Sequence, residues 1–234
     1  MNILAFDTCL GALSLAVRWR GGGGEWLMRH AYEARQSGHA ERLMPMMSEV
    51  MQAAGLAFGD IDRIAVTVGP GSFTGVRVGV AAARGLALAT GAVTVGATSL
   101  AVMAHQADER LGSARGDRLL AVAVDARRGS VYFQLFTAAR EELGPPRLLA
   151  ADDAASCIGP RPAIIVGSGA AVVAGAVAAA GGRAEAALDE LQPDARSLAV
   201  LAADLPVAAP LQPLYLRPPD VKPQADRSLP RASR

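Results

Sequence analysis

A glycine-rich connection between a strand and a helix constrains the fold more than any other part of this sequence. Residues 65–83 read AVTVGPGSFTGVRVGVAAA, in which a short apolar run ends at a Gly-Pro-Gly turn and an uncharged run of small residues follows. The pattern predicts a buried strand, a tight turn at 69–71 and a helix capped by Ser72 or Thr74. Glycine permits close approach of a ligand or of another backbone, and backbone N–H groups at a helix start attract anions. The turn therefore either binds phosphate or packs backbone on backbone.

The turn matches neither of the common nucleotide-binding motifs. Its glycine spacing is G-x-G-x-x-x-G, one residue away from the dinucleotide fingerprint, and no G-K-S/T sequence follows it. Lys222 is the single lysine of the chain and lies in its last residues, so no lysine can reach a phosphate from this turn. An anion bound here would be held by the backbone.

The composition indicates one large domain or two small lobes with a packed core. Hydrophobic residues make up 51% of the 234 residues and aromatic residues 4%, so we expect a core of Ala, Val, Leu and Ile. The formal net charge of +1 gives no basic footprint for tight, independent binding of nucleic acid. We therefore expect that any nucleic acid meets a partner protein first.

The cysteines and the N-terminus predict a cytoplasmic protein. Cys9 and Cys157 are too few and too far apart to suggest a disulfide framework or a zinc site. The start MNILAFDTCL has no basic region, and Asp7 interrupts its apolar run, which argues against a signal peptide. The uncharged segment 163–182 is mostly Ala and Gly and is broken by glycines, so strand, turn and helix explain it better than a membrane span.

An internal repeat predicts two lobes. Asp7 and Asp125 each end an apolar run, and each is followed four residues later by a glycine and then by an alternating strand. Residues 164–169 and the helix after them then repeat the plan of residues 65–83. We predict an α/β fold of mixed sheets and helices, divided into a first lobe (1–103), a second, smaller lobe (104–217, with a helix at about 197–203 that could return to the first lobe) and a disordered tail (218–234).

Two lobes that each open with a hairpin tipped by Asp and Gly resemble the actin-like ATPase and sugar-kinase superfamily, the ASKHA or ribonuclease H-like fold. In that superfamily the hairpin tips face phosphate in a cleft between the lobes. The two aspartates here could hold a hydrated cation beside phosphate, or accept N–H groups of their own turns. The candidates for facing a nucleotide or phosphate are Asp7, Thr8, Gly69, Gly71, Ser72, Gly75 and Asp125.

A closer resemblance comes from six stretches in order: LAFDTCLGALSLAV, HAERLMPMMSEVM, AVTVGPGSFTGVRVGVAAARGLALA, VGATSLAVMA, AVDARRGSVYFQLF and PLYLR. Together they resemble the TsaB (YeaZ) family of the bacterial tRNA threonylcarbamoyladenosine (t6A) system. The resemblance is strong over about residues 1–137 and weak beyond. HAERLMP, GPGSFTGVR and DARRG are specific in combination, although each alone would be weak.

The resemblance implies an accessory protein that does not catalyse the reaction alone. Its expected partners are a catalytic relative, TsaD, and a small ATPase, TsaE, in a complex that transfers a threonylcarbamoyl group to N6 of adenosine 37 of tRNA. The chain would then meet tRNA indirectly, through the complex, and a homodimer is a further option. No cofactor is assigned, although ATP or ADP with Mg²⁺ at a subunit interface stays open.

The catalytic relative carries a metal-binding H-x-x-x-H where this chain reads SLAVM from Ser99 to Met103. Serine and methionine cannot replace two imidazoles around a hard or borderline metal. The histidines are His30, His39 and His105, and no two stand four residues apart. We therefore assign no metal site and no catalytic residue.

The resemblance also implies a partner interface on the helices of the first lobe. The residues expected there are His39, Glu41, Leu43, Met47, Arg77, Gly79, Ala83 and Arg84. Small residues would let helices approach closely, and arginines suit the rim of an interface. For these residues the alternatives are the lobe's own core for the apolar ones and a solvated helix face for the charged ones.

Two other function classes remain as alternatives. A small ATPase or sugar kinase would use Asp7 for a cation and residues 69–75 for phosphate, but no sugar site is identifiable. A metalloprotease follows only from an older glycoprotease label of the family, and the missing histidine pair argues against it.

Overall fold

The computed structural model describes residues 1–207 and 211–217, and the predicted disordered tail lies outside these described residues. The first half of the chain forms β1 (Ile3–Asp7), β2 (Ala12–Arg20), β3 (Trp26–Ala34), α1 (His39–Ala54), β4 (Arg63–Thr67), α2 (Phe73–Thr90) and β5 (Val93–Ala97). The second half forms α3 (Ser99–Leu111), β6 (Leu119–Asp125), β7 (Ser130–Phe136), β8 (Arg147–Ala150), α4 (Ala151–Ile158), β9 (Ala163–Val166), α5 (Ala170–Ala179), β10 (Ala184–Ala187) and α6 (Ala195–Leu201).

The two halves build the same sheet twice. The first sheet has the strand order β3-β2-β1-β4-β5, and the second, taken in the matching direction, has the order β8-β7-β6-β9-β10. In each sheet the opening hairpin is antiparallel and its first strand pairs in parallel with the strand that precedes a helix of small residues. The predicted repeat and the predicted α/β class with two mixed sheets are confirmed.

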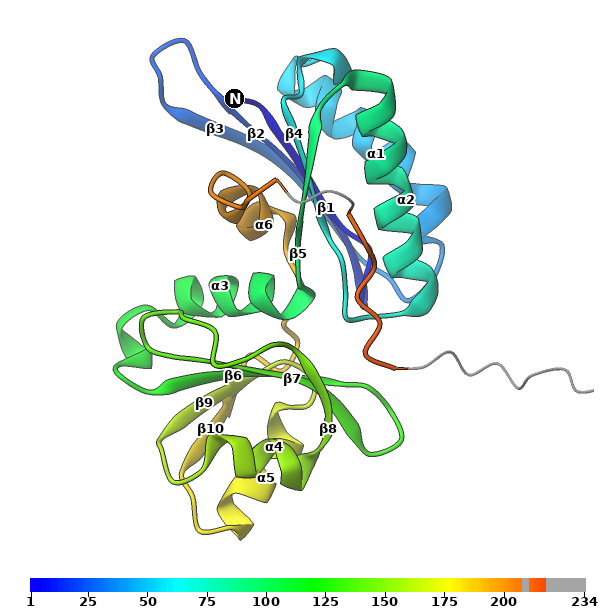
Figure 1. The fold of residues 1–234 in the computed structure, drawn as a ribbon. Helices are drawn as coiled ribbons and strands as arrows, with labels where there is room; N and C mark the ends of the chain where they lie inside the picture. The colour runs from blue at the N-terminus through cyan, green and yellow to red at the C-terminus, as the bar shows by residue number, and fades with distance from the viewer. Residues whose placement is uncertain (208–210, 218–234) are drawn as a thin grey trace, which may run out of the picture.

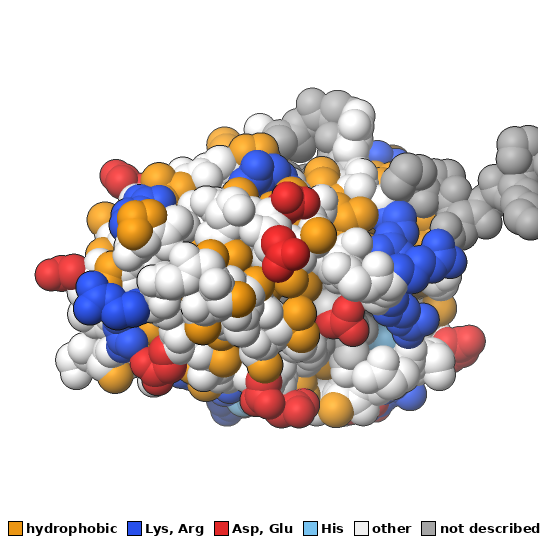
Figure 2. Space-filling view, turned by 90° about the horizontal axis from the view of Figure 1, so that it is seen from below, with side chains coloured by type: hydrophobic (Ala, Val, Ile, Leu, Met, Phe, Trp, Pro, Cys, Tyr) orange, Lys and Arg blue, Asp and Glu red, His pale blue; other side chains and the backbone are white. Residues whose placement is uncertain are grey.

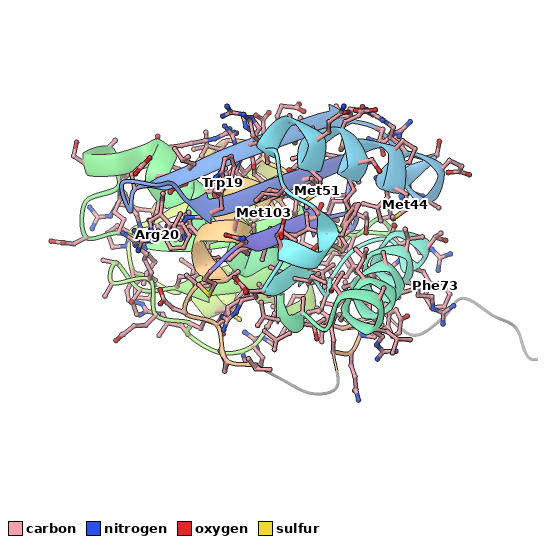
Figure 3. All side chains as sticks on the ribbon, turned by 90° about the horizontal axis from the view of Figure 1, so that it is seen from above. Trp19, Arg20, Met44, Met51, Phe73 and Met103 are labelled. Carbon is pink, nitrogen blue, oxygen red and sulfur yellow. The ribbon has the colours of Figure 1, made fainter. Side chains whose placement is uncertain are left out.

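The elements stack in layers, with α1 and α2 outside the first sheet and α4 and α5 outside the second (Figure 1). Helices α3 and α6 lie between the two sheets. Alternation along β1 feeds two cores, because Leu4 and Phe6 pack with α1 and α2 while Ile3 and Ala5 pack with α6. Two methionines are labelled in Figure 3: Met51 lies in the core under α1, and Met103 lies in a further core, between α3 and the second sheet.

The end of the described chain returns to the first lobe. Leu198 of α6 packs against the first sheet, and Arg63 of β4 donates hydrogen bonds to carbonyls at the end of that helix. Residues 211–217 then run along α2: Leu211 enters the first-lobe core, and Arg84 donates to its carbonyl. Helix α6 thus packs on the first lobe, as the helix expected at about 197–203 could do. Residues 211–217, which we expected in the second lobe (104–217), also pack on the first lobe.

None of the helices within the described ranges is long and apolar enough to cross a membrane.

Two glycines of α2 provide a test of the packing. A methyl group at Gly75 would collide with the carbonyl oxygen of Thr8, whereas one at Gly85 would meet nothing within 4 Å. We expect Gly75→Ala to lower the free energy of unfolding by about 1–3 kcal/mol, because backbone cannot move aside cheaply. The matched Gly85→Ala should raise it by up to about 1 kcal/mol through helix propensity. Chemical denaturation measures both, and equal effects at the two positions would contradict the packing described.

Candidate functional site

A cavity of about 920 Å³ lies between the lobes. The first lobe contributes the tip of its opening hairpin and the start of α2, at residues 9–11 and 70–73. The second lobe contributes the equivalent hairpin tip at 124–127 together with Ser168. Residues 214–217 and the linker before α6, with Asp189, Glu190 and Gln192, complete the wall. Two hairpin tips thus face one space, as the two-lobed repeat predicts.

The glycine-rich turn packs tightly on the chain that follows β1. A methyl group at Gly71 would collide with the carbonyl of Cys9, and the Ser72 N–H donates to that carbonyl at 2.7 Å. The Ser72 hydroxyl caps α2 by accepting the Gly75 N–H at 3.1 Å. The Ser72 and Gly75 N–H groups are therefore already used, so they do not offer a free backbone cradle for an anion.

Asp7 lies behind the cavity rather than on its wall. Its side chain is fully buried and does not line the cavity. The hydroxyl of Thr67 and the N–H of Cys9 both donate to Oδ1, and Oδ2 has no hydrogen-bond partner among the described residues. Burial raises the pKa of the Asp7 carboxyl to about 7, and the bonds from Thr67 and Cys9 oppose this rise. A carboxylate sealed in this way does not fit a hydrated cation beside phosphate in the cavity.

Asp125, the equivalent residue of the second lobe, is exposed on the cavity wall. Its Oδ1 accepts the N–H of Arg127 at 2.8 Å, which is the turn hydrogen bond expected for an aspartate at a hairpin tip. Arg127 and Arg128 follow with φ of 64° and 55°, a left-handed conformation that is uncommon outside glycine. The turn explanation for Asp125 is confirmed.

The start of α2 and the segment 211–217 form an aromatic cluster at the edge of the cavity. The rings of Phe73 and Tyr215 lie with centroids 5.3 Å apart. The guanidinium of Arg77 stacks on Phe73 at 3.5 Å from the ring centroid and donates to the Tyr215 hydroxyl at 2.8 Å. Figure 3 labels Phe73, which is the first residue of α2.

The seven candidates for facing phosphate are therefore not brought together. Gly71, Ser72 and Asp125 line the cavity. Thr8 is buried, and its hydroxyl donates to the Gly75 carbonyl at 2.7 Å, which ties that pair to each other. Gly69 packs closely against the carbonyl oxygen of Leu214, so a side chain at this position would collide with it. A phosphate-facing role for the three residues on the wall stays a prediction.

The predicted partner interface needs a correction. Leu43, Met47 and Ala83 are at most 2% exposed and belong to the first-lobe core, so they cannot contact a partner in this arrangement. Gly79 brings α2 against β1 and β4, since a methyl group there would lie 2.6 Å from the Thr8 hydroxyl oxygen. The apolar residues do share helix faces, but these faces pack against the lobe's own sheet.

The other expected interface residues divide by burial. Glu41, Arg77 and Arg84 are exposed and stay predictions, whereas His39 is nearly buried and its Nε2 lies 3.2 Å from the Ala12 carbonyl oxygen.

Several residues on the cavity wall were missed from the sequence. Gln192 accepts the Gly11 N–H at 2.8 Å and Arg217 donates to the Arg127 carbonyl at 3.3 Å, so both connect parts of the chain that are far apart in sequence. The signals available in the sequence were two stretches: PLYLR, which contains Tyr215 and Arg217, and DARRG, which contains Arg127.

A metal centre has little support within the part of the chain that the structure describes. No group of three or more His, Cys, Asp or Glu there could hold a metal ion. Burial and the neighbouring Asp7 raise the pKa of the Cys9 thiol, which keeps it protonated.

Two lobes that repeat one sheet order, with a cavity between them that both opening hairpins face, define the class of two-lobed α/β proteins. Comparisons with known proteins narrow this class. The family model described as "TsaD: tRNA N6-adenosine threonylcarbamoyltransferase" matches residues 33–161, more than half of the chain.

Relatives and solved structures agree with that match. The Escherichia coli tRNA threonylcarbamoyladenosine biosynthesis protein TsaB is 37% identical over 57% of this chain and 54% of its own length. An uncharacterized protein of Mycobacterium tuberculosis is 36% identical over 96% of this chain and 95% of its own length. The solved structure of YeaZ from Pseudomonas aeruginosa has a TM-score of 0.75 and 29% identity, and the match covers 92% of this chain and 99% of that one.

The chain belongs to the TsaB (YeaZ) family of glycoprotease-like proteins. It spans about half the length of the curated TsaB relatives that it matches.

The burial of Asp7 predicts a pH-dependent stability. A folded-state pKa of about 7, above the ordinary 3.8, favours folding most at acidic pH, and this contribution is lost as the pH rises towards 7. Wild-type protein should lose about 2–3 kcal/mol of unfolding free energy from this group between pH 5 and pH 8. Asp7→Asn, which cannot ionise, should show a correspondingly flatter profile in denaturant titrations at the two pH values. Parallel profiles for the two proteins would disprove the assignment.

Proposed function

We propose that this protein is a non-catalytic partner and activator of the tRNA t6A37 transferase complex. Membership of the TsaB family, and the naming of its E. coli and Haemophilus influenzae relatives as tRNA threonylcarbamoyladenosine biosynthesis proteins, support the pathway. The observation that supports an accessory role most directly is Asp7. An actin-like ATPase needs a carboxylate facing the cleft for its cation, and this one is buried behind the glycine turn.

The partner proposed is a TsaD-like catalytic subunit, joined by a TsaE-like ATPase, with tRNA reached through the complex. The outer face of α2 offers a surface for such a contact. Leu88 is 91% exposed there, and Arg77, Ala81 and Arg84 are exposed on the same helix. An exposed apolar residue beside arginines suits the centre and rim of a protein interface.

A small ATPase or kinase is the second candidate, and the cavity of about 920 Å³ favours it. The closed turn and the sealed Asp7 leave Asp125 as the remaining hairpin carboxylate, and Asp125 is engaged by its own turn. Calorimetric titration with ATP and Mg²⁺ separates the two functions, because micromolar binding with turnover by the isolated chain would favour the enzyme.

The pathway itself is tested by depletion. We expect cells depleted of this chain to lose t6A from tRNAs that read codons beginning with A, as measured by nucleoside mass spectrometry. We also expect the purified chain alone to give no t6A, and its addition to a TsaD-like and TsaE-like pair to restore synthesis. Full transfer without this chain would refute the proposal.

The interface is tested by a pair of charge substitutions. Leu88→Arg places a charge in the proposed contact and should weaken association with the TsaD-like subunit by about tenfold or more, because a buried unpaired charge is costly. Val172→Arg is the control, since Val172 is 63% exposed on α5 of the other lobe. Surface plasmon resonance measures both affinities. If the two variants bind equally, the outer face of α2 is not the contact.

A further inference from the structure

Phe73, Tyr215 and Arg77 contact one another, yet the two aromatic rings stay largely open to solvent. Phe73 and Tyr215 are 44% and 42% exposed, although their rings touch and Arg77 stacks on one of them. The Arg77 bond to the Tyr215 hydroxyl fixes both rings relative to α2. The result is a fixed aromatic surface at the edge of the cavity, since both rings also line it.

Two arginines border this surface, Arg127 from the second lobe and Arg217 from the segment that runs along α2. Arg127 and Arg217 line the same cavity, and the Arg217 guanidinium donates to the Arg127 carbonyl. Arg127 and its neighbour Arg128 are both held in the left-handed conformation, which is strained for arginine and is often retained where a side chain has a binding role. On the face shown in Figure 2, basic side chains gather at one edge of the molecule.

The linker before α6 contributes two acidic residues and an amide to the same wall. Asp189, Glu190 and Gln192 supply hydrogen-bond acceptors. These carboxylates would repel a phosphate inside the cavity, but they can accept N–H groups from the edge of a nucleobase. Arginines, aromatic rings and hydrogen-bond acceptors on the walls of one cavity match the parts of an unpaired nucleotide strand.

We propose that this edge of the cavity binds single-stranded RNA within the t6A complex. Phe73 and Tyr215 stack on unpaired bases, Arg127 and Arg217 contact the phosphates, and one base enters the cavity towards the carboxylates. The inference rests on the proposed function for the presence of RNA, and it adds a direct contact where only an indirect one was expected. The net charge of +1 makes this contact an addition to the partner's binding rather than a site of independent high affinity.

The test measures the anisotropy of a fluorescein-labelled, single-stranded RNA heptamer with the full chain and with its assembled complex. Tyr215→Ala should weaken binding to both by about 5- to 150-fold, the loss expected when one stacked base is released. Tyr215→Phe keeps the ring and should retain most of the affinity, which excludes a general structural effect. Arg217→Ala should reduce the slope of log affinity against log salt by about 0.7.

The control is another arginine–aromatic stack. Arg18 and Arg20 lie over the Trp26 ring at 3.9 and 4.0 Å, at the far end of the β2–β3 hairpin. Trp26→Ala should leave the affinity unchanged, and the heptamer closed in a duplex should bind more weakly than the single strand.

Each outcome bears on one proposal. Wild-type affinity in Tyr215→Ala together with an unchanged salt slope in Arg217→Ala, or an equal loss in Trp26→Ala, overturns the RNA site. The accessory function stays intact in that case if depletion still removes t6A. Retention of t6A in depleted cells overturns the accessory function instead, whatever the heptamer binds.

Discussion

The close contact between the glycine turn and the chain after β1 is the constraint on which the rest of the structure depends. Gly71 and Gly75 bring the start of α2 onto the carbonyls of Cys9 and Thr8, at a distance that no side chain would allow. This contact fixes α2 over the first sheet. It also closes off Asp7, whose carboxyl then takes its hydrogen bonds from Thr67 and Cys9 instead of from solvent. This one contact therefore sets both the packing of the lobe and the burial of its aspartate.

The aromatic and basic groups on the cavity wall come from other parts of the chain. Arg84 holds the carbonyl of Leu211, and the Leu214 N–H donates to the Val68 carbonyl, so residues 211–217 follow α2 down to the cavity. Arg217 then reaches across to the second lobe. These contacts depend on the position of α2. The aromatic and basic edge of the cavity therefore depends on the same glycine packing that buries the Asp7 carboxylate.

The sequence predicts local structure well because the relevant signals are local. Ser72 caps α2, and the alternating strands after Asp7 and Asp125 form hairpins as expected. The repeat was visible because both lobes use the same order of turn residues and strands. These features depend on residues within a few positions of one another.

Burial and long-range contacts could not be predicted in the same way. Periodicity shows that Leu43 and Met47 share a helix face, but it does not show whether that face meets a sheet or a partner. The bond between Gly11 and Gln192 joins residues 181 positions apart, and no local pattern marks it. The composition also misled in one respect, because a net charge near zero hides arginines that folding gathers at one edge of the cavity.

The different fates of Asp7 and Asp125 follow from strand register. In the first lobe the last parallel pair is Phe6 with Val66. Asp7 therefore lies one residue past this pair, directly beside the turn that follows β4. In the second lobe the last parallel pair is Val122 with Val166, and the Gly169 N–H donates to the Ala123 carbonyl. Asp125 therefore extends three residues past the last pair and stays on the cavity wall. The parallel pairing thus ends two residues further from the aspartate in the second lobe than in the first. This difference buries one carboxylate and exposes the other, so the second lobe keeps a polar tip that can take part in binding.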